Sequence, residues 1–132
     1  MPEVFKPTLA LLNTQVQSLD EAGRLMLKGM NVNVDPKELV TTFIGGGVSI
    51  MHTRHWVDVP TVAFMRPLKP LSEDGVRVEY IFLVVSPKDD PDAHLIALAR
   101  IARLMTRPEV KQKLSETHRE QEVINVFQEF TG

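Results

Sequence analysis

The sequence predicts an α/β fold in which helices sandwich a mixed β-sheet. Strand-like and helix-like segments follow one another in the order β-α-(α)-β-β-β-α-α-α. The run at 80–85 is apolar enough for a strand that is buried on both faces. The chain has 132 residues, enough for one core, and contains no repeat or low-complexity tract. We expect one domain over 1–132, with 1–7 as a tail.

The first elements are a strand and a helix. Residues 10–16 read as a strand, and Ser18-Leu19-Asp20-Glu21 then has the spacing of a capping box, which predicts a helix from Leu19. Apolar and small residues recur along it at intervals of three and four, so one stripe should face the core. We expect a short second helix over 36–43, with Asp35 as its cap and Pro36 in its first turn.

Three strands should follow, at 48–51, 61–65 and 76–86, with a turn at 73–75. The last strand is expected at the centre of the sheet because it is the most apolar. Asp90-Pro91 then predicts the start of a helix that runs to about Met105 and turns His94 toward the sheet.

Two further helices complete the chain. Pro108-Glu109 suggests a short helix, and Thr117 with Glu120 has the spacing of a second capping box. Apolar residues at 123, 124, 127 and 130 follow it.

Composition excludes several classes of function. The 15 basic and 17 acidic side chains give a net charge of −2, which gives no bulk attraction to nucleic acid or anionic lipid. The absence of cysteine rules out disulfides, thiolate nucleophiles and cysteine metal sites. No leader or apolar run of membrane-spanning length is present. We expect a soluble, cytoplasmic protein that does not insert into the membrane.

The most informative stretch is Gly45-Gly46-Gly47-Val48-Ser49-Ile50-Met51-His52-Thr53-Arg54. Glycines allow positive φ, and the backbone N–H groups of such turns can form a nest for an anion. A histidine, a hydroxyl and a guanidinium follow within ten residues, and together they suit a phosphoryl group.

This pattern resembles the enzyme IIA domain of the bacterial phosphoenolpyruvate-dependent phosphotransferase system, in its mannitol/fructose and nitrogen-regulatory class. The family's Thr-x-x-Gly segment and its strand ending in Pro-His align with 42–52. A later buried strand, a loop with proline and His-Leu-x-x-Leu-Ala align with 82–87 and 94–99. The resemblance covers nearly the whole chain, and it implies the family's sheet topology.

The resemblance implies a phosphocarrier in which His52 accepts phosphate and His94 is the second histidine of the site. The implied partners are a phosphate donor of the HPr type and either a sugar-specific IIB domain or a regulated transporter. No metal or organic cofactor is needed at the acceptor. We expect His52 and His94 to converge in a polar surface depression with Thr53 and Arg54 at its rim, where they would bind phosphate.

Two departures from the family pattern support an alternative. Met51 stands where the family has proline, and Pro36-Lys37 stands where the family has the Arg-Glu pair whose arginine helps to hold phosphate. The alternative is therefore a catalytically silent regulatory or interaction domain, which could be attached to a membrane transporter.

Other interpretations of single motifs remain open. His94 could be a buried histidine that only satisfies a core carbonyl. His52 and His55 have the His-x-x-His spacing of some metal sites, although no glutamate accompanies them as in His-Glu-x-x-His, and Trp56 would cover His55. The arginines at 100, 103 and 107 could recognise an acidic partner or form an ordinary solvated helix face.

Overall fold

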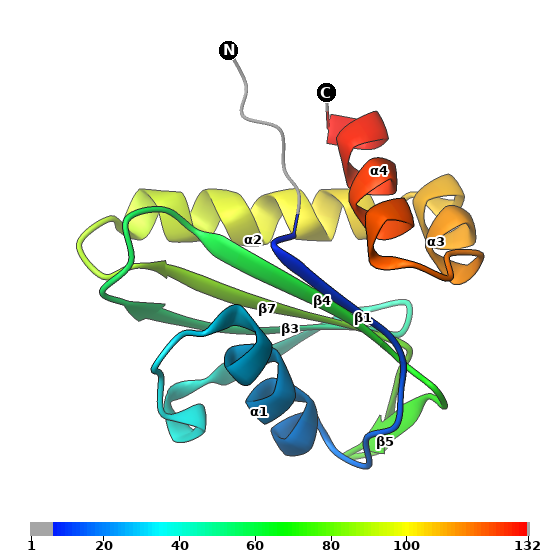
Figure 1. The fold of residues 1–132 in the computed structure, drawn as a ribbon, viewed down its shortest axis with the longest axis horizontal. Coiled ribbons are helices and arrows are strands. Elements are labelled where there is room, and N and C mark those ends of the chain that lie inside the picture. The colour runs from blue at the N-terminus through cyan, green and yellow to red at the C-terminus, as the bar shows by residue number, and fades with distance from the viewer. Residues whose placement is uncertain (1–6, 132) are drawn as a thin grey trace.

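The computed structural model describes residues 7–131 and shows a mixed sheet between two layers of helices (Figure 1). The expected tail at 1–7 lies outside these residues except for Pro7, which is buried. The elements in chain order are β1 (Leu9–Thr14), α1 (Leu19–Met30), the 3₁₀ turn η1 (Pro36–Glu38), β2 (Val40–Gly45), β3 (Val48–His55), β4 (Thr61–Pro67), β5 (Leu71–Glu73), β6 (Val76–Val78), β7 (Tyr80–Pro87), α2 (Pro91–Met105), α3 (Pro108–Ser115) and α4 (Glu120–Thr131).

The main sheet has the strand order β1-β4-β7-β3-β2. Strand β7 is its centre, as predicted, and every residue of this strand is buried. It runs parallel to β3 and antiparallel to β4. Because parallel strands end at the same edge, the carboxyl ends of β3 and β7 lie side by side.

Each face of the sheet has its own core. Helix α1 covers one face, and α2, α3 and α4 cover the other (Figure 1). Alternate residues of β3 divide between the two cores, since Ile50 belongs to the cluster with α2 and Met51 to the cluster with α1. Within residues 7–131, no helix is both long and apolar enough to cross a membrane.

The caps of α1 and α2 form as predicted. Ser18 accepts a hydrogen bond from the backbone N–H of Glu21 at 3.1 Å, and α1 begins at Leu19. Asp90 accepts from the N–H of Ala93 at 3.1 Å and is the N-cap of α2. Both oxygens satisfy N–H groups that a helix leaves free in its first turn.

The helix predicted at 36–43 is wrong. Asp35 does cap a turn through the N–H of Lys37 at 2.9 Å, but that turn ends at Glu38. Residues 40–45 form the edge strand β2, which pairs antiparallel with β3. The β-branched residues of Val40-Thr41-Thr42 favour this extended form.

The strand predicted at 76–86 is divided. Residues 76–78 pair with β5 as a hairpin, and β7 begins at Tyr80. Asp74 and Gly75 form the hairpin turn, with φ values of 51° and 80°. Positive φ at both central residues is typical of a type I′ turn, which explains the turn signal at this position.

The capping box predicted at Thr117 does not form. Thr117 is buried and donates to the carbonyl of Leu114 at 2.7 Å. Instead, the side chain of Glu122 accepts from the backbone N–H groups of His118 at 2.9 Å and Arg119 at 3.0 Å, the two residues before the helix. Helix α4 begins at Glu120.

Candidate phosphoryl-transfer site

His52 lies on β3, on the face of the sheet that α2 covers. Side chains of a strand alternate between faces, so His52 shares its face with Ile50, which packs in the α2 core. The ring of His52 is half-buried. Its strand is held on both sides, by β2 and by β7, which fixes the position of the backbone.

His94 lies in the first turn of α2 and points toward the sheet, as predicted. Its Nδ1 atom lies 2.9 Å from the Oγ atom of Ser86, the buried serine near the end of β7. The helix begins directly beyond that strand, after the loop at 88–90. Because this connection is short, the first turn of α2 lies next to the carboxyl end of β7.

The structure brings the two histidines together. Their ring centroids are 5.2 Å apart, with an angle of 54° between the ring planes. A phosphoryl group on either ring would lie within reach of the other. The two rings lie this close because β3 and β7 are parallel. The last residues of β3 therefore lie beside the end of the strand that leads to α2.

Both histidines favour the neutral form. Burial is the main cause that lowers the pKa of His52 below its ordinary value, and the nearby His94 lowers it further. Burial also lowers the pKa of His94, and the positive charge of Arg54 adds to that effect. A neutral ring nitrogen keeps the lone pair that a nucleophile needs.

Arg54 is a cation next to the pair. It lies two residues after His52 on β3, so its side chain starts from the same face of the sheet, and it is exposed. The positive charge of Arg54 contributes to the lowered pKa of His94. Arg54 is thus placed to offer charge and donors to an anion at the histidines.

Thr53 does not join this group. It follows His52 on β3 and therefore faces the α1 layer, opposite Val85 of that core. Its hydroxyl donates to the carbonyl of Arg54 at 3.5 Å. The expectation that Thr53 binds phosphate beside His52 conflicts with this placement.

Thr42 occupies the position that was expected of Thr53. Its Oγ1 atom lies 3.1 Å from Nε2 of His52, across the hairpin from β2. Sequence reasoning did not assign it a role, although Thr42 opens the aligned Thr-x-x-Gly segment. The register of the hairpin was the missing information, because Val40 is the direct partner of His52 and Thr42 its diagonal neighbour.

The glycine run lies away from the histidines. Gly45, Gly46 and Gly47 have positive φ values of 85°, 63° and 80°; Gly45 ends β2, and Gly46 and Gly47 form the turn to β3. With a rise of about 3.3 Å per residue, Gly47 and His52 stand about 16 Å apart along β3. The turn cannot be an anion nest for His52. Instead, Lys111 donates to the carbonyl of Gly46 at 3.0 Å.

The alternative metal site at His52 and His55 is not formed, because residues three apart on a strand face opposite sides. Trp56 is 74% exposed, and the Nζ atom of Lys88 lies 5.0 Å from its ring centroid. His118 is exposed. Of the three arginines, Arg107 forms an ion pair with Glu109 at 2.8 Å.

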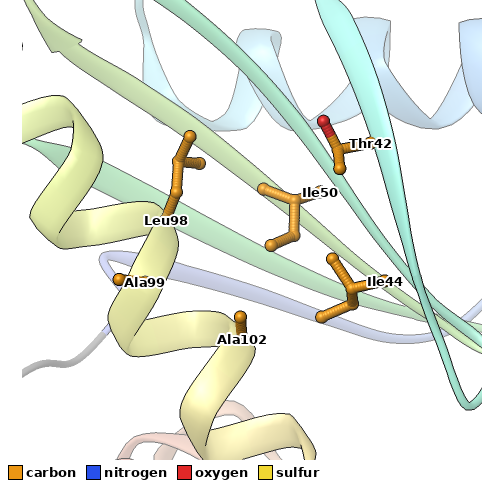
Figure 2. Close-up of a pocket in the computed structure, with 6 residues that line it drawn as sticks. All are labelled: Thr42, Ile44, Ile50, Leu98, Ala99 and Ala102. Atoms are coloured by element: carbon orange, nitrogen blue, oxygen red, sulfur yellow. The ribbon is translucent and has the colours of Figure 1, made fainter.

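A hollow beside the histidines is apolar. A pocket of about 250 Å³ lies between β2, β3 and α2 (Figure 2). It is lined by Thr42, Ile44, Ile50, Leu98, Ala99 and Ala102. Thr42 connects the two features, since its hydroxyl bonds to His52 and its side chain lines the pocket.

Met51 has a structural reason to differ from the family's proline. It is buried against α1, where a methyl group added at Gly23 would meet its Cε atom. Strand β3 is paired on both sides, and a proline at this position would remove one N–H donor from the sheet. Methionine keeps that donor and fills the space over Gly23.

A sheet sandwiched by helices, with two histidines meeting at the carboxyl edge of parallel strands, defines an enzyme IIA-type domain. The chain belongs to this family: residues 4–130 match the one described as phosphoenolpyruvate-dependent sugar phosphotransferase system, EIIA 2. The resemblance found in the sequence is thereby confirmed.

Individual relatives show the same relationship. A nitrogen regulatory protein from Bradyrhizobium diazoefficiens is 32% identical over 142 residues, which cover 96% of this chain and 90% of that protein. The fructose-specific EIIABC component of Bacillus subtilis is 27% identical over 125 residues, 89% of this chain but only 19% of that protein. The crystal structure of the nitrogen regulatory protein IIA-Ntr from Neisseria meningitidis superposes with a TM-score of 0.73 at 27% identity, covering 90% of this chain and 92% of that one.

Proposed function

We propose that His52 accepts a phosphoryl group from a phosphohistidine carrier of the HPr type in the cytoplasm. The group then passes to a sugar-specific IIB domain, or its presence regulates a partner protein. The single observation that carries this proposal is the 5.2 Å separation of His52 and His94 beside the charge of Arg54. The names of the relatives support both branches, since one is a nitrogen regulatory protein and another a fructose-specific component.

The transfer needs little from the protein beyond position and charge. A neutral ring nitrogen of His52 attacks phosphorus while the N–P bond of the carrier breaks, and the carrier ring keeps that electron pair. The His52 ring releases a proton and the carrier ring takes one up, so charge balances. His94 and Arg54 are placed to donate to the phosphoryl oxygens.

A catalytically silent regulatory domain is the second candidate. The observation in its favour is Pro36, which opens η1 where the family arginine is expected. The charge of Arg54 lowers the pKa of His94. The pKa of His52 is lowered by burial and by His94, and Arg54 is not among the causes of that shift. In this alternative the histidines form a docking surface that never carries phosphate.

One experiment separates the two candidates. The protein is incubated with phosphoenolpyruvate, enzyme I and HPr, and its intact mass is measured. Phosphotransfer predicts one added phosphate that is lost in acid, because the N–P bond of phosphohistidine is acid-labile. The variant His52→Ala should gain none, and the control His118→Ala, which changes an exposed histidine of the α3–α4 loop, should gain one. An unmodified wild-type protein would favour the silent domain, and a modified His52→Ala protein would overturn the assignment of His52.

A further inference from the structure

Ser86 is a polar residue in an otherwise apolar setting. It is the seventh residue of β7, has no solvent exposure, and is preceded by apolar side chains that are also buried. Its Oγ atom contacts Nδ1 of His94 at 2.9 Å. Across the parallel pair it lies opposite Arg54. A buried hydroxyl near the end of the central strand is therefore hydrogen-bonded to the ring of His94 from the side of the sheet.

The hydrogen of this hydroxyl decides which nitrogen of His94 is protonated. A serine has one O–H donor, and a neutral histidine has one N–H donor and one acceptor nitrogen. Within residues 7–131, His94 is the one hydrogen-bond partner of the Ser86 side chain. If Nδ1–H donated to Ser86, the serine hydrogen would remain buried without an acceptor, which is costly. The satisfied arrangement has Ser86 donating to Nδ1.

We propose that Ser86 is a positioning residue that holds His94 as the tautomer protonated on Nε2. The ring then offers one N–H, at Nε2, which can donate to an oxygen of a phosphoryl group on His52. The burial and the positive charge near His94 both act to keep the ring neutral, as this role requires. The assignment of the tautomer does not depend on the proposed function. The role of the Nε2–H group in phosphoryl transfer rests on the proposed function.

The tautomer can be measured in the unphosphorylated protein. Long-range ¹H–¹⁵N spectra of the histidine rings distinguish a protonated from an unprotonated nitrogen, at a pH above the pKa of His94. We expect one species in the wild type, with the proton on Nε2. The variant Ser86→Ala should show a mixture of the two tautomers. A wild-type ring protonated on Nδ1, or a Ser86→Ala ring that keeps the proton wholly on Nε2, would overturn the proposal.

The chain offers a matched control in Ser49. This serine of β3 is equally buried, its hydroxyl has no hydrogen-bond partner among residues 7–131, and it faces the α1 side of the sheet. The variant Ser49→Ala removes a hydroxyl of the same burial without touching a histidine. Its His94 tautomer should match the wild type. A mixture in Ser49→Ala as well would show that general loosening of the sheet, rather than Ser86, controls the ring.

The effect on transfer is measured as the rate of phosphorylation by the HPr-type donor. Loss of one hydrogen bond that orients His94 should slow Ser86→Ala by about five- to tenfold. Ser86→Thr, which keeps the hydroxyl, should recover both the rate and the tautomer, and Ser49→Ala should leave the rate unchanged. An unaltered rate in Ser86→Ala alongside a mixed tautomer would overturn the catalytic part of the proposal and leave the tautomer assignment. A wild-type protein that takes no phosphate would refute the proposed function, while the spectra would still decide the tautomer.

Discussion

Arg54 and Ser86 are direct partners across the parallel strands β3 and β7, and His94 interacts with both of them. Arg54 acts on His94 through its charge, and Ser86 acts on it through a hydrogen bond. His94 can therefore be altered in two independent ways, by changing its pKa or by changing its tautomer.

Replacing Arg54 should raise the pKa of His94. The guanidinium lowers this pKa by disfavouring a second positive charge, so Arg54→Gln removes that contribution. Burial remains, which should keep the pKa below 6.5. An NMR titration of the ring protons measures the shift. Arg77→Gln on β6, an exposed arginine paired with Glu79, is the control and should leave His94 unchanged. An equal shift in both variants would contradict the assigned contact.

Replacing His94 should raise the pKa of His52. Burial is the larger cause of the lowered value and His94 the smaller one, so His94→Ala should recover part of the shift. The residual shift then reports the burial of His52 that remains without the neighbouring ring. The control is His55→Ala, which removes a histidine on the other face of β3. A pKa of His52 that does not move in His94→Ala would mean that the two rings do not sense each other's charge.

Stability should decline as the pH falls below the ordinary histidine pKa of 6.5. Both histidines have a lowered pKa in the folded protein, so between the lowered values and 6.5 the unfolded chain binds more protons. Their contribution is complete above 6.5 and is lost as the pH falls through the folded values. Urea denaturation at a series of pH values measures this loss. It should be smaller in the double variant His52→Gln/His94→Gln, and an equal loss would assign it to other groups.

Removing the Phe64 ring should destabilise the α2 side of the sheet. Phe64 is fully buried, and its ring centroid lies 5.2 Å from that of Phe82 and 6.0 Å from that of Phe127. Phe64→Ala should cost about 3–5 kcal/mol of unfolding free energy, through lost burial and the cavity left behind. Chemical denaturation gives this value. A loss below about 1 kcal/mol, as for surface changes, would contradict the packing described.

Arg66 should stabilise the turn between α3 and α4. Its guanidinium donates to the carbonyls of Leu114 at 2.6 Å and Thr117 at 2.7 Å, and to the side chain of Asn13 at 3.3 Å. Arg66→Ala removes the guanidinium from all of these acceptors, and the carbonyl of Leu114 keeps the Thr117 hydroxyl as a donor, so the change should cost about 1–3 kcal/mol. Arg77→Ala, which breaks only an exposed ion pair, should cost less than about 1 kcal/mol. Equal losses would show that the buried carbonyls are satisfied in another way.

The sequence predicted the elements whose signals are local. Asp90-Pro91 marked the start of α2, and the apolar run at 80–85 marked the central strand. The helix predicted at 36–43 failed because a good cap at Asp35 serves only one turn. Strand β2 is an edge strand with exposed residues on both faces, so it lacks the alternation that identifies a half-buried strand.

The site was predictable only in part, for a related reason. The family pattern placed His52 and His94, and the structure brings them together. Thr53 was included because it is adjacent in sequence, although adjacency on a strand means opposite faces. Thr42 and Ser86 reach the histidines through strand pairing, and the register of that pairing is not visible in the sequence alone. Ser86 could have been suspected as a lone hydroxyl in an apolar strand.

The glycine turn between β2 and β3 lies at the end of β3 away from His52, with its carbonyl held by Lys111. A side chain at Gly45 would meet no other atom within 4 Å, but the φ of 85° there strains any residue that has a Cβ atom. A reporter peptide inserted into the turn after Gly45, in place of a substitution, would therefore stand away from a protein that docks over the histidines. The turn leads into β3 and His52 lies near the other end of that strand, so a reporter in the turn can report on binding at the histidines without competing for the same surface.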